Sequence, residues 1–265
     1  MNGTIEGQVA LFTGPPTPLT LTVARCLANA GVRLAFAGPR ISAEPGLQPL
    51  LYQFHRDVFC FDVELSAPQA VQQIAEQTER ALGGLDILIH TVGVARTDRC
   101  LDLLDPGAQA VVWDGGGPLR AALTCSSGAM RYMARRRHGH ILHLVTRADV
   151  GALEVERLVL DRLQQAWSQD GARSSVTMSA IYFEETATLL LPAAAPARTE
   201  PRLLEMYTGR LVEEDTWIRK VMLEREIGRL VLQVCGRMDR VAPGEVQSFD
   251  FSETLRPIAE ASSVT

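Results

Sequence analysis

The chain has 265 residues, 46% of them hydrophobic, and a formal net charge of −5. This apolar content excludes a disordered chain, and the length suits one domain with one sizeable core. The net negative charge excludes a general attraction to nucleic acid, and the chain has no run of about 18 apolar residues that would predict a membrane span. We therefore expect a cytoplasmic protein that binds neither nucleic acid nor membrane. Its five cysteines show no C-x-x-C spacing and are expected to stay reduced.

The first predicted unit is a strand, a turn and a helix. Val9–Phe12 is a continuous apolar run, typical of a strand covered on both faces, and apolar residues recur at helical spacing from Leu19 to Ala30. Such a unit opens dinucleotide-binding domains, in which a glycine-rich turn lets backbone N–H groups approach the pyrophosphate. Here the turn keeps Gly14 but has prolines at positions 15, 16 and 18, which remove N–H donors. We interpret the cofactor cradle as dismantled.

Strands and helices then alternate toward the middle of the chain. Val32–Ala37 is typical of a second strand, and no acidic residue ends it, although NAD-selective proteins usually carry one there. Arg40 follows instead, and it is either an exposed loop residue or a contact for the 2′-phosphate of NADP. A third strand at Val58–Val63, a helix at Pro68–Leu82 and a fourth strand within Gly84–Gly93 continue the alternation. This order predicts a Rossmann-type α/β fold, a doubly wound parallel sheet in three layers, α/β/α.

Five segments occur in the order and spacing of a known family. They are the first strand with Thr13-Gly14, Asp62-Val63 after the third strand, Gly84–Ile89 before a four-residue turn, the strand His138–Thr146, and the helix and strand within Glu226–Phe251. On these segments the chain resembles the short-chain dehydrogenases/reductases. The resemblance implies a single domain at residues 1–252, with a segment at about 184–216 in the place of the substrate lid. Residues 253–265 are then a polar C-terminal tail.

The resemblance also defines where catalytic residues are expected. In that family a tyrosine four residues before a lysine exchanges a proton with the substrate, assisted by a serine and an asparagine. The lysine lowers the pKa of the tyrosine, so the two must share one helix face. This chain has a single lysine, Lys220, and Thr216 stands four residues before it. The family's four positions fall instead on Pro118, Thr146, Leu153 and Arg157. Because leucine donates no proton, we predict no catalytic residue by the family's mechanism.

The positions that hold the cofactor in the family keep little of its pattern. They fall on Gly14, Arg40, Asp62, Val63 and Gly93. The two later glycines of the family's turn are replaced by Pro18 and Thr20. These departures from the family pattern predict that no cofactor is bound. If a cofactor is bound, Arg40 favours NADP.

Two histidines near the ends of neighbouring strands offer a different chemistry. His90 and His143, with Tyr182 as a further candidate acid, can form a general acid/base pair for a lyase, cyclase or isomerase in the same cleft. Alternatively, the two histidines satisfy local backbone groups in place of the family's asparagines. A metal site is not expected, because His138 and His140 face one side of a strand and His143 faces the other.

Two predicted helices are candidates for contact with a second subunit. Helices at about 119–137 and 153–167 correspond to those through which members of the resembled family pair, and both carry apolar stripes. The same stripes can instead pack on the chain's own sheet. From the missing catalytic pair we predict a non-catalytic or supporting subunit in a homo- or hetero-oligomer, paired with an active ketoreductase of that family. The alternatives are the non-redox enzyme and an atypical NADP(H)-dependent ketoreductase with Tyr182 as acid.

Overall fold

The computed structural model describes residues 5–14, 16–65, 68–93, 117–146, 175–183, 224–236 and 246–250. Within these segments the strands are β1 Val9–Thr13, β2 Arg33–Gly38, β3 Val58–Asp62, β4 Ile87–Gly93, β5 Gly139–Thr146, β6 Val176–Phe183 and β7 Val246–Asp250. The α-helices are α1 Pro18–Asn29, α2 Gln48–Gln53, α3 Pro68–Leu82 and α5 Gly117–Arg136. A further helix, called the C-terminal helix below, covers residues 224–235. Two short 3-10 turns, Ile41–Ala43 and Pro45–Leu47, precede α2.

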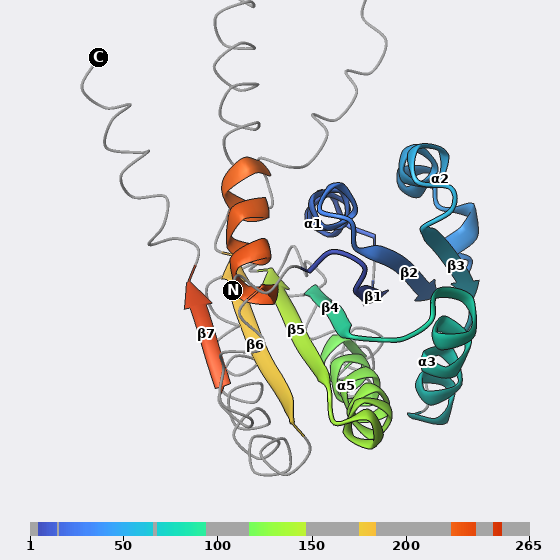
Figure 1. Cartoon of the computed structure of the whole chain (residues 1–265), viewed down its shortest axis with the longest axis vertical. Coiled ribbons are helices and arrows are strands. Elements are labelled where there is room, and N and C mark those ends of the chain that lie inside the picture. The colour runs from blue at the N-terminus through green and yellow to red at the C-terminus, as the bar shows by residue number, and fades with distance from the viewer. Residues whose placement is uncertain are drawn as a thin grey trace, which may run out of the picture.

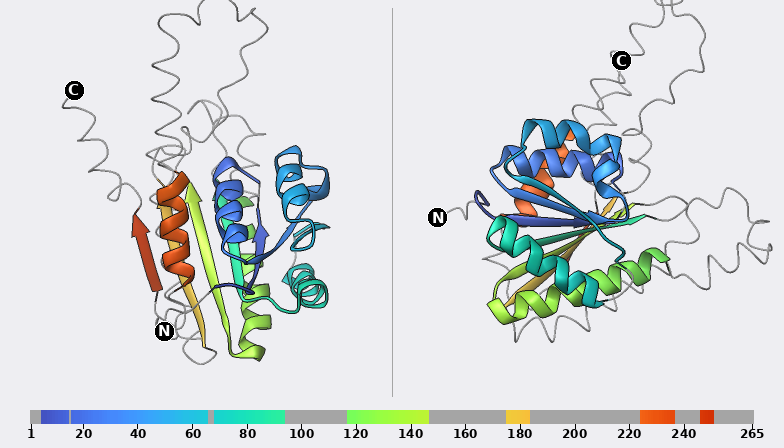
Figure 2. Two further views of the ribbon diagram at one scale, coloured as in Figure 1. Left: turned by 45° about the horizontal axis from the view of Figure 1, so that its top comes forward. Right: turned by 90° about the vertical axis from the view of Figure 1, so that its right-hand side faces the viewer.

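The described strands form one parallel sheet in the order β3-β2-β1-β4-β5-β6-β7 (Figure 1). Helices α1 and α2 and the C-terminal helix cover one face, and α3 and α5 cover the other (Figure 2). The three-layer α/β fold predicted from the alternation is therefore confirmed. Among the described residues, no helix has the length and apolar content that a membrane span requires.

β1 shows why the first strand is apolar along its length. Ala10 and Phe12 enter the core beneath α1, whereas Val9 and Leu11 enter the core beneath α3 and α5. Successive side chains of a strand point to opposite faces, so a strand covered on both sides needs apolar residues at neighbouring positions. Every residue of β1 is buried. Each large side chain buried in this way contributes about 1.5–3 kcal/mol relative to exposure.

Two elements have no counterpart in the sequence-based prediction. β6 is buried at every residue, but Thr177 and Ser179 interrupt its apolar run and obscure the strand pattern. Thr177 is accommodated because its hydroxyl lies 2.7 Å from Nδ1 of His140. The short helix α2 is the second addition. The predicted helix at 153–167, the lid-like segment at 184–216 and the tail at 253–265 lie outside the described residues.

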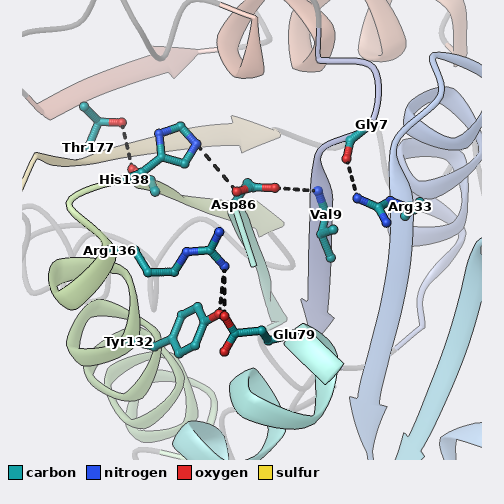
Figure 3. Close-up of polar contacts among 10 residues, drawn as sticks. Gly7, Val9, Arg33, Glu79, Asp86, Tyr132, Arg136, His138 and Thr177 are labelled. Atoms are coloured by element: carbon teal, nitrogen blue, oxygen red, sulfur yellow. Dashed lines mark hydrogen bonds and ion pairs between the residues drawn. The ribbon is translucent and has the colours of Figure 1, made fainter. Parts of the chain in front are cut away.

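A polar network lies at the amino ends of the strands (Figure 3). Asp86, just before β4, accepts a hydrogen bond from the backbone N–H of Val9 at 2.9 Å and lies 3.6 Å from Nε2 of His138. Arg136, at the end of α5, donates to the hydroxyl of Tyr132 at 2.9 Å. These contacts tie the starts of β1, β4 and β5 together, so this edge of the sheet serves packing. The opposite edge carries the candidate site.

Candidate functional site

The predicted cofactor positions gather at the carboxyl edge of the sheet, where ligands bind in doubly wound folds. Gly14 directly follows β1, Arg40 follows β2, and Asp62 ends β3. Gly93 ends β4 and is the register partner of Thr146, which ends β5. One edge of the sheet thus holds the whole predicted set, Gly14, Arg40, Asp62, Val63 and Gly93, together with Thr146.

Gly14 allows the chain to turn tightly after β1. Its φ of +99° is in the left-handed region, and a Cβ added there would lie 2.7 Å from the carbonyl oxygen of Thr91. Only glycine adopts this conformation at no steric cost, and the atom in the way belongs to the backbone of β4. The first turn of the site is therefore packed directly on β4.

The start of α1 offers few backbone donors. Oγ1 of Thr17 caps the helix by accepting from the N–H of Thr20 at 3.2 Å, and Pro18 has no N–H. Among the first three residues of the helix, this leaves the N–H of Leu19 available to an anion. Hydroxyl groups continue the site, because Oγ1 of Thr20 lies 2.9 Å from that of Thr17 and 3.0 Å from that of Thr91. A phosphate at this turn would meet one N–H group and the Thr17 hydroxyl.

The turn after β2 carries the positively charged side chain of Arg40. Arg40 is exposed, has a left-handed backbone with φ 54°, and makes no ion pair within the described segments. Beside it, the carboxylate of Asp62 accepts one hydrogen bond from the Ser42 N–H at 2.9 Å and another from the Ser42 hydroxyl. The hydroxyl, and after it the N–H, hold the pKa of Asp62 below its usual value. The carboxylate is thus ionised at neutral pH and bound to the turn.

The two candidate histidines lie side by side within the sheet. His90 on β4 and His143 on β5 are register partners, and their ring centroids are 6.3 Å apart. Nδ1 of His90 lies 2.7 Å from the hydroxyl of Thr13, and Nε2 of His143 lies 2.9 Å from that of Ser126 on α5. Each of these two contacts is made to a side-chain hydroxyl.

Burial decides what these histidines can do. The exposed fraction is 1% for His90 and 0% for His143. Burial lowers the pKa of His143 to about 4, so its ring is neutral at pH 7. A neutral ring beneath α5 is separated from solvent. This arrangement argues against the general acid/base pair of the non-redox hypothesis.

The other histidines near β5 contact separate partners. His140 bonds to Thr177 on β6, and its three-residue spacing from His143 puts the two on opposite faces of the strand. His138 lies at the amino edge beside Asp86. Within the segments that the structure describes, no three His, Cys, Asp or Glu side chains are grouped to hold a metal ion.

Among the described tyrosines, Tyr182 is the one at the carboxyl edge. It is the second-last residue of β6, is 6% exposed and is the register partner of Val145 on β5. Tyr132 precedes Arg136 by four residues, which copies the tyrosine-to-cation spacing of the resembled family. That pair lies at the amino edge (Figure 3), and burial raises the pKa of Tyr132. A phenol whose pKa is raised there is not an activated acid for this site.

The remaining predicted positions are only partly described. Pro118 is the second residue of α5, and Leu153 and Arg157 lie outside the described residues. The apolar stripe of α5 packs on the chain's own sheet, where Ala129 and Met133 are buried with residues of α3. The stripe of this helix is therefore used within the subunit at those positions.

Several polar residues of the edge were not singled out from the sequence. They are Thr17, Ser42 and Ser126. Thr17 had a readable signal, because threonine before a proline is typical of a helix cap followed by the first helical residue. The partners of Ser42 and Ser126 are distant in sequence or on another element, and no local pattern indicates them.

Comparison with known proteins finds similarity to reductases and dehydrogenases, both in sequence and in structure. The family model described as enoyl-(acyl carrier protein) reductase matches residues 19–246. A 2-dehydro-3-deoxy-D-gluconate 5-dehydrogenase of Bacillus subtilis (strain 168) is 24% identical over 183 residues, 67% of this chain and 70% of the relative. The solved 2-keto-3-deoxy-D-gluconate dehydrogenase of Streptococcus agalactiae covers 94% of both chains with a TM-score of 0.61 at 15% identity. L-sorbose reductase of Gluconobacter frateurii, solved with NADPH and L-sorbose, has a TM-score of 0.53 at 19% identity over 69% of this chain and 71% of its own.

These similarities correct the predicted function. The matched family and relatives are named as reductases and dehydrogenases, so the prediction of a non-catalytic supporting subunit is wrong. The alternative prediction, an atypical NADP(H)-dependent ketoreductase, agrees better with them. The prediction fails because it gives the missing tyrosine–lysine pair and the missing turn glycines more weight than the preserved order of strands and helices. A missing pair excludes one proton donor and leaves others at the same edge.

Proposed function

The chain belongs to the short-chain dehydrogenase/reductase superfamily, and on this basis we propose that it is an atypical NADP(H)-dependent ketoreductase. The observation that carries the proposal is the turn after β2. NAD-selective proteins place a carboxylate there to bind the ribose, whereas an arginine nearby accommodates the 2′-phosphate of NADP. Arg40 is exposed at this turn and has no ion-pair partner in the described segments. A guanidinium group matches the geometry of a phosphate.

The donors at the carboxyl edge fit an anionic dinucleotide. The N–H of Leu19 and the hydroxyl of Thr17 lie at the start of α1, where the helix dipole favours negative charge. We assign these two groups to the pyrophosphate and Arg40 to the 2′-phosphate. NADPH, when bound, supplies the hydride for reduction of a carbonyl carbon.

Reduction of a ketone also requires a proton for the carbonyl oxygen. We assign this proton to the hydroxyl of Tyr182, which replaces the family's tyrosine as donor. The assignment is supported by the position of Tyr182 near the carboxyl end of β6. Arg157, at the family's lysine position, supplies the positive charge in this proposal, although an arginine holds its own proton too tightly to relay one.

Cofactor binding is the first test of the proposal. Purified protein is titrated with NADPH and NADH, and binding is followed by nicotinamide fluorescence and by the melting temperature. A cofactor at 100 times its Kd adds about 2.7 kcal/mol of stability, which is readily measured. We expect NADPH to bind about tenfold more tightly than NADH, as one charge-assisted contact to the phosphate provides. Binding of neither cofactor at millimolar concentration would overturn the proposal.

Two matched variants test the residues involved. Arg40→Leu is expected to remove most of the preference for NADPH. Arg56→Leu is the control and should keep the preference, because Arg56 is an exposed arginine before β3.

Turnover is then measured with a panel of ketones that includes 2-keto-3-deoxy sugar acids and sorbose, because relatives are named for these compounds. Tyr182→Phe is expected to abolish turnover and leave NADPH binding intact. Full turnover in this variant would show that another group donates the proton.

A further inference from the structure

The turn between β2 and α2 is tied to the neighbouring strand by one side chain. Asp62, the last residue of β3, accepts hydrogen bonds from both the backbone N–H and the hydroxyl of Ser42. Two bonds from one residue to both oxygens of a carboxylate fix the distance and the orientation of the turn relative to β3. Asp62 and Ser42 are both exposed, so this contact has no packing role in the core.

The segment that this contact restrains contains Arg40. The residues between β2 and Ser42 are Pro39, Arg40 and Ile41. Arg40 has φ 54° and ψ 28°, a left-handed conformation that non-glycine residues adopt only where their surroundings impose it. On one side the turn is anchored by the side chain of Ile41, which is buried. On the other side Ser42 is held by Asp62.

We propose that the contact between Asp62 and Ser42 is a latch that holds Arg40 in the backbone conformation in which it receives the 2′-phosphate of NADP(H). Ser42 and Asp62 are then specificity-determining residues that act through Arg40. This inference rests on the proposed function, because it concerns the same cofactor site. It goes further by naming which residues set the choice between NADPH and NADH.

The hydrogen bonds of Ser42 show that it positions Arg40 and does not itself bind the 2′-phosphate. Both of its donors, the N–H and the hydroxyl, are engaged with Asp62, so neither is available to a phosphate while the latch is closed. The carboxylate of Asp62 is itself negative and would repel a phosphate placed against it. The attraction for the 2′-phosphate must therefore come from Arg40, and the latch contributes by fixing the turn.

The test compares Ser42→Ala, Asp62→Asn and the double variant with the wild-type protein. Asp57→Asn is the matched control, because Asp57 is an exposed carboxylate just before the other end of β3. The Kd values of NADPH and NADH are measured for each protein by nicotinamide fluorescence. A second measurement needs no cofactor: the rate at which trypsin cleaves the bond after Arg40, identified by the mass of the fragments.

We expect each single variant to weaken NADPH binding by about tenfold, the usual effect of removing a hydrogen bond to a charged group. The loss is expected to be much smaller for NADH, which has no 2′-phosphate for Arg40 to bind. Both single changes alter the bond between the Ser42 hydroxyl and the Asp62 carboxylate, so the double variant should weaken NADPH binding by less than the product of the two single effects. Trypsin should cleave after Arg40 faster in all three latch variants, and Asp57→Asn should behave as wild type in both measurements.

Other results would overturn the latch. Tighter NADPH binding in Asp62→Asn would mean that the carboxylate only repels the phosphate. Equal weakening of NADH and NADPH would mean that Asp62 contacts the part that both cofactors share. If wild-type protein binds NADPH and the variants bind it equally well, the latch fails and the proposed function stands. If wild-type protein binds neither cofactor, the proposed function fails and the latch fails with it.

Discussion

The buried histidines of β5 make a quantitative prediction for acid stability. Burial and, to a lesser extent, the neighbouring His143 lower the pKa of His140 from 6.5 to about 3, and burial lowers that of His143 to about 4. Both rings therefore stay neutral in the folded protein at pH 5, whereas exposed histidines of the unfolded chain are protonated. The unfolded state binds more protons, so stability must fall as the pH drops below about 6.5.

The size of the effect follows from the number of protons taken up. Each histidine that binds a proton only on unfolding lowers the free energy of unfolding by about 1.4 kcal/mol per pH unit. From pH 7.5 to pH 5 this amounts to about 2 kcal/mol for each ring and about 4 kcal/mol for both. The loss levels off only near the folded-state pKa values of about 4 and about 3. Domains of this kind have a total stability of about 5–15 kcal/mol, so the loss is large.

Urea unfolding between pH 7.5 and 5, read by tryptophan fluorescence, measures this loss directly. His140→Gln and His143→Asn should each reduce the pH dependence between about pH 6.5 and 5 by one proton, and the double variant by two. His55→Gln provides the control, because His55 is exposed. If wild-type protein and the double variant lose stability equally between these pH values, the two rings are not neutral in the fold and the reasoning is wrong.

Three further predictions concern glycine and cysteine positions. Gly14→Ala should lower the free energy of unfolding, measured in urea, by about 1–3 kcal/mol more than Gly7→Ala does. Both glycines have a positive φ, but of the two only Gly14 has a backbone atom within 4 Å of the new Cβ. Equal losses would show that the contact with β4 is unimportant. Gly228→Ala should cost about 1–3 kcal/mol by thermal unfolding, since its Cβ would lie 2.5 Å from Sγ of Cys26, and the additional change Cys26→Ala should restore part of the loss. Burial raises the pKa of the Cys125 thiol to about 11, so this thiol should react with a disulfide reagent at pH 8 only after unfolding, and fast labelling of Cys125 by mass spectrometry would contradict its burial.

The fold was predictable because its signals are local. β1 is a run of apolar residues covered on both faces, and α3 repeats apolar residues at helical spacing. Each of these elements can therefore be predicted from a short stretch of sequence. β6 was not predicted as a strand, because Thr177 and Ser179 interrupt the apolar pattern expected of a buried strand. A buried threonine there is stabilised by His140 of the neighbouring strand, which no local pattern can reveal.

The site was predictable in position and much less so in contacts. The ends of parallel strands meet at one edge, so the order of elements was enough to bring Gly14, Arg40 and Asp62 together. The bonds from Ser42 to Asp62 and from Thr20 to Thr91 depend on how the segments lie in space. The function was misjudged for a related reason, because a missing motif was weighed more heavily than a preserved architecture.

The C-terminal helix has a consequence for the synthesis of the chain. Its residues Ile227 and Val231 cover the same core as Leu142 and Leu144 of β5 and Phe183 of β6. Translation proceeds at about 5–20 residues per second, so these strands leave the ribosome several seconds before the helix that covers them. During that interval this apolar surface lacks the residues of the C-terminal helix that cover it in the folded protein. Chaperones that bind such surfaces should therefore engage this chain late in translation and release it once the helix emerges.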